Sequence, residues 1–260
     1  REIMINTIDL RNLTTSQGFK IIGAEAGDWT GYSVSKAGDF NGDGIDDIII
    51  GAYQAGSSNK SYAGATYVVY GIFGEFNDID LSNLMTSQGF KIIGAASGDR
   101  TGRSVNDAGD VNGDGIGDII IGAVGTSLVG IPSISTAYVI YGKSSGLSNI
   151  DLASLLPTQG FKIISATSGD AIGYSVSRAG DINNDGIDDI IIGAHQTGLD
   201  NRTYAGAAYV IYGSTGVLSN IDLANLTLTQ GFRISGAAAY DRVGYAVSNA
   251  GDVNGDGIDD

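Results

Sequence analysis

The sequence GYSVSKAGDFNGDGIDDIIIGA occupies residues 31–52 and contains the features that decide the fold. An acidic, glycine-containing loop at residues 39–47 separates an alternating run from a short aliphatic run at residues 48–50. A short continuous apolar run between turn signals is typical of a strand buried on both faces. The stretch therefore predicts two strands joined by a tight, oxygen-rich turn.

The same stretch returns along the chain at a fixed interval. Acidic loops begin at Asp39, Asp110, Asp181 and Asp252, each 71 residues after the last. The strings Gln-Gly-Phe and Ile-Asp-Leu each occur four times at the same spacing. Coincident series without drift indicate a tandem repeat, here three full units and part of a fourth.

Each repeat predicts about four strands and almost no helix. In the first unit, residues 31–38, 48–52 and 65–70 are strand candidates, and residues 19–22 are typical of the remaining one. The helical prediction is limited to about one turn at residues 80–85, with Asp80 as its cap. Four strands in a repeat longer than forty residues favour an all-β fold of β-propeller blades, each with four antiparallel strands. A β-helix is the alternative, disfavoured because the acidic loop and Ile-Asp-Leu would interrupt its coils.

Composition narrows the function classes. The 260 residues include 29 acidic and 14 basic side chains, a net charge of −15, with one histidine and no cysteine. A polyanion of this size repels nucleic acid and anionic lipid, so neither is an expected partner. Without cysteine, a disulfide framework, an iron–sulfur cluster and a thiolate zinc site are excluded. No aliphatic run is long enough to span a bilayer, so no membrane insertion is expected.

The acidic loops have the spacing of a Ca²⁺ site. Side-chain oxygens stand at loop positions one, three, five and nine, a glycine at six permits a sharp turn, and position seven offers its carbonyl. We expect up to four Ca²⁺ ions, one per loop, which would bring the net charge from −15 to −7. The predicted ligands are Asp39, Asn41, Asp43, Ile45 and Asp47; Asp110, Asn112, Asp114, Ile116 and Asp118; Asp181, Asn183, Asp185, Ile187 and Asp189; and Asp252, Asn254, Asp256, Ile258 and Asp260.

A metal-free turn and an EF-hand or dockerin loop are the alternatives for these loops. Asn/Asp-Gly sequences also form tight turns without a metal, but four identical loops would then crowd carboxylates with nothing to neutralise them. An EF-hand or dockerin loop needs an acidic residue at position twelve and a following helix. Position twelve is Ile50, Ile121 or Ile192, each inside a predicted strand, so neither class fits.

Residues 31–52 and their copies at residues 102–123, 173–194 and 244–260 resemble the FG-GAP repeat of integrin α-subunit propellers and related bacterial surface proteins. The resemblance implies that each calcium loop joins the first and second strands of a blade, and that the chain is an open, incomplete part of a seven-bladed propeller. The implied division is a linker and outer strand of a preceding blade at 1–29, blades at 30–94, 95–165 and 166–236, and the inner strand and calcium loop of a truncated blade at 237–260.

The loops at the other end of the strands are the expected binding face. They are residues 53–62, 124–135 and 195–204 and the crossovers 24–30, 95–101, 166–172 and 237–243, and the first set differs most between repeats. Exposed aromatics and arginines are common recognition residues, although loops also vary where nothing constrains them. The candidates for contact with a protein or glycan ligand are Trp29, Tyr53, Lys60, Tyr62, Arg100, His195, Arg202, Tyr240 and Arg242.

The sequence predicts a binding module rather than an enzyme. His195 is the only histidine and has no second base beside it, and the repeated crossover aspartates Asp28, Asp99, Asp170 and Asp241 are typical of turn caps. The leading hypothesis is a calcium-binding adhesion or protein-binding propeller, extracellular or at the cell surface. The alternative is a non-catalytic accessory propeller of a secreted hydrolase or toxin whose catalytic domain lies elsewhere.

Overall fold

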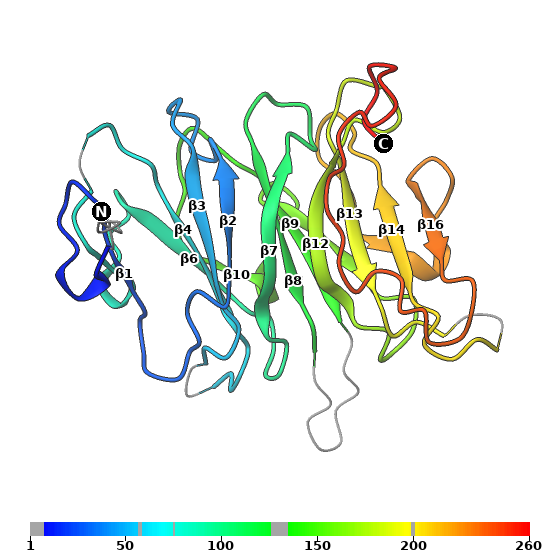
Figure 1. Ribbon diagram of the computed structural model, residues 1–260, viewed down its shortest axis with the longest axis horizontal. Helices are drawn as coiled ribbons and strands as arrows, with labels where there is room; N and C mark the ends of the chain where they lie inside the picture. The colour runs from blue at the N-terminus through cyan, green and yellow to red at the C-terminus, as the bar shows by residue number, and fades with distance from the viewer. Residues whose placement is uncertain (1–7, 57–58, 75, 126–134, 199–200) are drawn as a thin grey trace, which may run out of the picture.

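The computed structural model describes residues 8–56, 59–74, 76–125, 135–198 and 201–260, and these form an all-β chain of sheets placed side by side (Figure 1). Each of the three large sheets is built from four antiparallel strands of one repeat. They are β2 (Ser33–Gly38), β3 (Asp47–Ala52), β4 (Ala65–Val69) and β6 (Gly89–Ile93); β7 (Thr101–Gly109), β8 (Asp118–Ala123), β9 (Thr136–Ile140) and β11 (Gly160–Ile164); and β12 (Ile172–Gly180), β13 (Asp189–Ala194), β14 (Ala207–Ile211) and β16 (Gly231–Ser235). The prediction of four-stranded propeller blades is confirmed.

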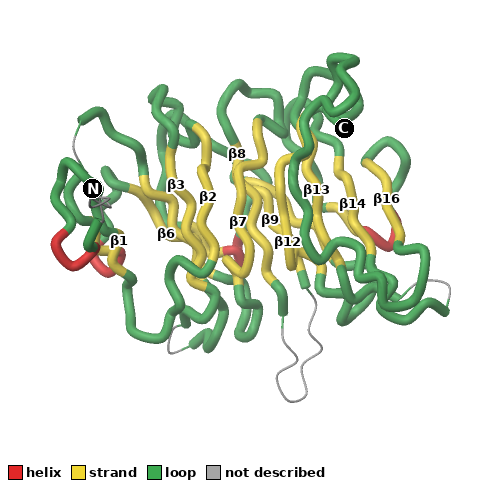
Figure 2. Tube along the Cα trace, in the orientation of Figure 1, coloured by secondary structure: helices red, strands yellow, loops and turns green. Residues whose placement is uncertain are grey.

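The row of sheets is open, with the two termini at opposite ends of it (Figure 1). The strands alternate in direction, so all acidic loops lie at one end of the sheets and the varying loops at the other, as the green segments of Figure 2 show. A six-residue strand separates the two ends by about 20 Å. Each repeat therefore has two loop surfaces that cannot share one ligand-binding group.

The Ile-Asp-Leu motif does two jobs in the structure. Its Ile and Asp form the short strands β5 (Ile79–Asp80), β10 (Ile150–Asp151) and β15 (Ile221–Asp222), which pair in parallel with the outer strand of the preceding repeat. The Asp then caps a single 3-10 turn, as predicted; Asp80 Oδ1 accepts from the Ser82 amide at 2.9 Å. These turns are η1 (Leu10–Asn12), η2 (Leu81–Asn83), η3 (Leu152–Ser154) and η4 (Leu223–Asn225). The parallel strand is an addition to the four that the sequence predicts.

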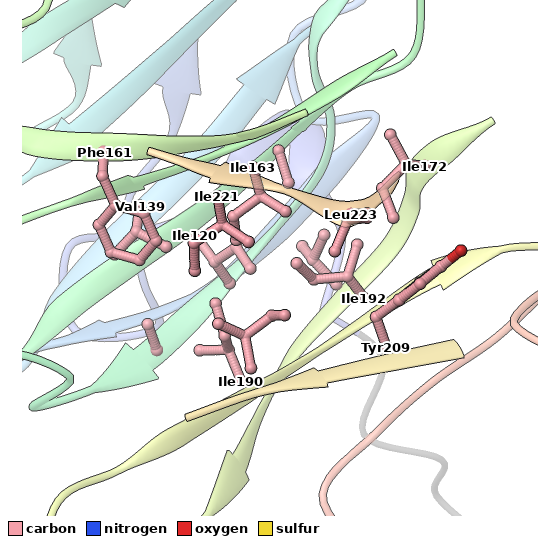
Figure 3. Packing of buried hydrophobic residues seen from close by; sticks show 14 of the residues in the cluster. Ile120, Val139, Phe161, Ile163, Ile172, Ile190, Ile192, Tyr209, Ile221 and Leu223 are labelled. Carbon is pink, nitrogen blue, oxygen red and sulfur yellow. The ribbon is translucent and has the colours of Figure 1, made fainter. Parts of the chain in front are cut away.

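The hydrophobic core lies between neighbouring sheets. One cluster joins Ile120, Val139 and Phe161 of the second repeat to Ile190 and Tyr209 of the third (Figure 3). Close packing between neighbouring sheets explains the glycine of the Gly-Ala pair that ends the second strand of each repeat. A β-carbon at Gly122 would overlap the carbonyl oxygen of Gly173 in the next repeat, so only glycine lets the sheets approach this closely.

Three regions differ from the sequence prediction or test it only partly. Residues 244–251 form no strand, and the isolated bridge nearest to them joins Val243 to Gly206. In the other repeats this strand pairs with the strand that follows the acidic loop. Residues 18–24 contain β1 (Ile21–Ile22), which pairs with β5 as the outer strand β6 pairs with β10. Most of the predicted loop at 124–135 lies outside the described residues.

Candidate functional site

The acidic loops are shaped by their own side chains. In the first loop, Asp39 Oδ1 and Asn41 Oδ1 both accept from the amide of Asp43 at 2.9 Å, and Asp39 Oδ2 accepts from the Gly44 amide at 2.8 Å. Asp43 Oδ1 in turn accepts from the Ile45 amide at 2.9 Å. The shared donor brings oxygens of positions one and three together. These bonds recur at the same positions in all four loops.

The aspartate at position nine joins the loop to the sheet. Asp118 Oδ2 accepts from the Val111 amide at 3.0 Å, and its Oδ1 accepts from the Gly142 amide at 2.9 Å, just after β9. Asp47 and Asp189 make the equivalent bonds in their own repeats. All three side chains are buried. A carboxylate taken out of water needs such donors because an unpaired buried charge is very unfavourable.

Burial also makes these carboxylates hard to ionise. Loss of hydration, and to a smaller extent the charges of Asp114 and Asp110, raise the pKa of Asp118 to about 8 despite its backbone hydrogen bonds. The pKa values of Asp47 and Asp189 rise to about 6 for the same first cause. A cation in the loop would favour the charged form.

The donor chemistry of the loops fits a hard cation, since carboxylate, amide and carbonyl oxygens are the ligands Ca²⁺ prefers. Within the described residues, however, no three acidic or histidine side chains stand close enough to form a metal cluster. One physical reason is that the position-nine carboxylates face backbone amides. Another is that the predicted set also uses an asparagine and a carbonyl. Ca²⁺ binding therefore stays a proposal.

The fourth loop repeats this geometry without a sheet behind it. Asp252 accepts from the amides of Gly255, Asp256 and Gly257, and Asp260 Oδ2 accepts from the Val253 amide at 2.8 Å. Asp260 is exposed, whereas its three counterparts are buried. The loop conformation is therefore encoded locally, and burial of position nine is added by the strands.

At the opposite end, three positions of each repeat form one surface. They are represented by Trp29, Tyr32 and Tyr53 in the first repeat, and residue 32 donates its amide to the carbonyl of residue 29 in a turn. Because neighbouring repeats pack side by side, these positions adjoin from sheet to sheet. We name the surface the aromatic–arginine band; its residues are Trp29, Tyr32, Tyr53, Arg100, Arg103, Tyr174, His195, Arg242 and Tyr245.

Ring and guanidinium contacts run through the band without a gap. Trp29 lies against Tyr53 with ring centroids 5.7 Å apart, and Tyr53 lies against Tyr32 at 4.5 Å. The Arg103 guanidinium lies 4.6 Å from the ring centre of Tyr32 and 4.5 Å from that of Tyr174. Tyr174 continues to Tyr245 at 5.1 Å. Four repeats thus contribute to one continuous surface.

His195 is a buried member of the band rather than a solvated loop residue. It is 4% exposed and packs edge-on against Tyr174 at 4.2 Å and Tyr245 at 5.2 Å. Burial lowers its pKa, and the charges of Arg242 and Arg103 lower it further. Its Nδ1 is buried with no hydrogen-bond partner among the described residues.

The other predicted contact residues lie outside the band. Lys60 is engaged by Asp151 of the next repeat at 2.7 Å, whereas Arg202 donates to the carbonyl of Gly236 in its own repeat at 2.6 Å and to that of Ala237 at 3.2 Å. Tyr62 is exposed, and Tyr240 lies 6.0 Å from Tyr204.

Among the crossover aspartates, Asp99, Asp170 and Asp241 cap turns as expected. Asp99 Oδ2 accepts from the Ala96 amide at 2.7 Å, and Asp241 Oδ2 accepts from the Ala238 amide at 2.7 Å.

Sequence reasoning missed the residues that join the band. Tyr32, Arg103, Tyr174 and Tyr245 occupy one repeat position at the start of the inner strand, each 71 residues after the last. These side chains lie at the start of a predicted strand, outside the loops and crossovers of the expected binding face. The repeat period itself held the signal, because equivalent positions of adjacent blades become neighbours.

Comparison with known proteins agrees with the repeats. The FG-GAP repeat family matches residues 30–69 and 172–211. Phosphatidylinositol-glycan-specific phospholipase D of Bos taurus is 34% identical over 147 residues, covering 56% of this chain and 16% of that protein. Integrin alpha pat-2 of Caenorhabditis elegans is 30% identical over 238 residues, covering 90% of this chain and 17% of that protein. Integrin alpha-PS3 of Drosophila melanogaster is 28% identical over 193 residues, covering 72% and 15%.

The matched region is a small part of these relatives, since the chain spans at most 17% of the length of those three proteins. In the part of the chain that the structure describes, no helix is long and apolar enough to cross a membrane.

Proposed function

The chain contains FG-GAP repeats, and from that premise we propose that it is a calcium-binding propeller module that binds a ligand on the face opposite its acidic loops. The module acts in adhesion or protein binding, at the cell surface or in a secreted protein. The relatives with integrin names favour this function over the others.

The observation that carries the calcium proposal is the repeated position-nine carboxylate. Asp47, Asp118 and Asp189 are buried beside other loop carboxylates, and each has a raised pKa. A divalent cation would neutralise several such charges at once and supply a local staple in a chain without disulfides. Ca²⁺ is favoured over Mg²⁺, which gives up its waters reluctantly.

Thermal unfolding in calcium tests the proposal. With a Kd on the order of 10⁻⁴–10⁻³ M, calcium at 100 times Kd stabilises by about 2.7 kcal/mol per site. The melting temperature is therefore expected to rise with millimolar calcium, to rise less with magnesium, and to fall with chelator. Melting that is indifferent to calcium and chelator would refute the calcium proposal.

A matched pair of variants locates the ion. Asp43→Ala removes the position-five oxygen, and Asp46→Ala removes the same charge from position eight of the same loop, which is not a predicted ligand. Calorimetric titration is expected to show one site fewer in Asp43→Ala and an unchanged number in Asp46→Ala. Equal stoichiometry in both variants would contradict the assignment.

A second candidate function is favoured by the phospholipase match. An accessory propeller of a secreted enzyme would have the same fold and the same loops, with catalysis in another domain. We assign no catalysis to this chain, so the isolated chain is expected to give no phospholipase D turnover. A hydrolase domain encoded in the same gene would favour the accessory function, and a membrane anchor or further adhesion repeats would favour the first.

A further inference from the structure

The arginines of the aromatic–arginine band form none of the ion pairs found among the described residues. The ion pairs among the described residues engage Arg11, Lys36, Lys60 and Arg178, and none engages Arg100, Arg103 or Arg242. With 29 acidic side chains present, carboxylate partners are plentiful. A group of cations without them, in a chain of net charge −15, points to an anion from outside.

The geometry of Arg103 leaves its binding edge free. Its guanidinium face is occupied by the rings of Tyr32 and Tyr174, at 4.6 Å and 4.5 Å from their centres. The five N–H donors of a guanidinium lie in its plane, so stacking fixes the group without using them. A carboxylate can then be held by two parallel hydrogen bonds. The rings orient the arginine for a ligand.

Two buried polar atoms of the band also lack partners. Arg100 Nε and His195 Nδ1 are buried with no hydrogen bond among the described residues. Buried polar groups are nearly always paired, so each unpaired one calls for an explanation. For Arg100 Nε and His195 Nδ1, a hydrogen bond to an oxygen atom of a bound ligand is a consistent explanation.

The backbone under the band is strained. Trp29, Arg100 and Arg242 have φ values of 56°, 54° and 54°, in the left-handed region where glycine or asparagine is favoured. Bulky side chains at such positions are unfavourable for folding, and strain of this kind gathers at functional sites. The repeat places large recognition side chains where folding alone favours glycine.

The exposed ring faces indicate the kind of anion. Trp29, Tyr32 and Tyr245 are 55%, 43% and 53% exposed, and they present flat surfaces along the band. A sugar ring has an apolar C–H face that packs on such a surface without a deep pocket, and the carboxylate of an acidic sugar reaches the guanidinium edge. An acidic peptide also supplies carboxylates, but its residues do not each have a flat apolar face that could stack on an aromatic ring.

We infer that the aromatic–arginine band binds an acidic polysaccharide, its sugar rings stacked on the exposed aromatics and its carboxylates held by Arg103 and its neighbours. This ligand class rests on the proposed function, because it specifies what the face opposite the acidic loops takes. The calcium loops are at the far end of the strands and have no part in the contact.

The chain carries its own reporter for this contact. Trp29 is its only tryptophan and stands at one end of the band. Titration with trigalacturonic acid, at fixed millimolar calcium, is expected to shift tryptophan emission to the blue as the ring is covered. The fully methyl-esterified trimer keeps the sugar rings but loses the carboxylates, and is expected to bind at least tenfold more weakly. Short trimers are used so that calcium does not cross-link the probe.

Variants test the role of Arg103. Arg103→Gln is expected to weaken trigalacturonate binding about tenfold or more, because it removes the charged hydrogen-bond fork. Arg103→Lys keeps the charge but not the planar fork, so it is expected to restore little of the affinity. Lys162→Gln removes one positive charge from an exposed site on β11 and is the matched control, expected to bind as the original chain does.

The outcomes separate this inference from the proposed function. It is overturned by absent binding, by equal affinity for the methyl ester, or by binding that survives Arg103→Gln, which would place the sugar elsewhere, for example at the acidic loops. Poly-L-glutamate that binds as tightly as the sugar would instead identify an acidic protein partner. Melting temperature is followed in the same samples. A calcium-dependent melt with no sugar binding refutes the inference alone, and a calcium-independent melt refutes the calcium proposal.

Discussion

The two ends of the repeats follow opposite rules. At the acidic end, four loops have nearly the same sequence and the same hydrogen bonds, from Asp39 to Asp260. At the band end, equivalent positions share their backbone conformation but not their side chains: φ is 56°, 54°, 58° and 54° at Trp29, Arg100, Ala171 and Arg242. The acidic loops are therefore part of the repeated structural scaffold, which we call the frame. The band instead carries different side chains on that scaffold, and these side chains are available for binding.

The largest expected effect is at position nine of the acidic loop. Asp118→Ala leaves the buried amides of Val111 and Gly142 without an acceptor, and is expected to reduce the unfolding free energy by about 2–4 kcal/mol. Urea unfolding in chelator, where no cation contributes, measures this cost.

Asp260→Ala is the matched control, because it changes the same loop position where the side chain is exposed. Its expected cost is about 0.5 kcal/mol or less. Equal costs for the two variants would show that burial by the strands adds nothing, and the acidic end would then be a set of independent turns rather than part of the frame.

The second effect concerns the strained backbone under the band. Arg100→Gly and Arg100→Ala both remove the side chain, but only glycine adopts a φ of 54° without steric conflict. Arg100→Gly is therefore expected to be more stable than Arg100→Ala by about 1 kcal/mol. Thermal and urea unfolding of the two variants measure the difference. If Arg100→Ala were the more stable variant, the backbone at this position would not be strained.

The sequence predicted the frame far better than the band. The 71-residue period, with its apolar runs and acidic turns, predicted the four strands of each blade, the hairpins at the loops and the Asp80 cap. All of these depend on contacts within one repeat. The parallel strand at Ile79–Asp80 was missed because a two-residue pairing leaves no periodic pattern. The expected strand at residues 244–251 did not form because a strand depends on its partner as much as on its own residues.

The band could not be read from a single repeat, because it is made by contacts between repeats. Arg103 meets Tyr32 of the repeat before and Tyr174 of the repeat after, and nothing in the sequence around Arg103 marks it. Likewise, the sequence predicts His195 only as a contact candidate in a varying loop, and its burial between two tyrosines is a property of sheet packing. The 71-residue period predicts which positions are equivalent, but not that the side chains at those positions contact one another.

The smallest expected effect is a shift in the pKa of His195. It tests whether the positive charges of the band arginines are neutralised by other groups of the chain. His195 is the only histidine, so its ring signals in an NMR titration belong to one site. Burial lowers its pKa from 6.5, followed by the charges of Arg242 and Arg103. Because the unfolded chain takes up the proton more readily, the contribution of His195 to stability is expected to fall as pH drops below about 6.5.

Arg103→Gln and Arg242→Gln are each expected to raise the pKa of His195 toward its ordinary value, since each removes a repelling charge. Lys162→Gln, distant on β11, is expected to leave it unchanged. A ligand carboxylate in the band would act in the same direction as the two arginine variants. If neither variant moved the pKa, the arginine charges would already be neutralised within the chain, and the contrast between an anion-seeking band and a cation-seeking acidic end would fail.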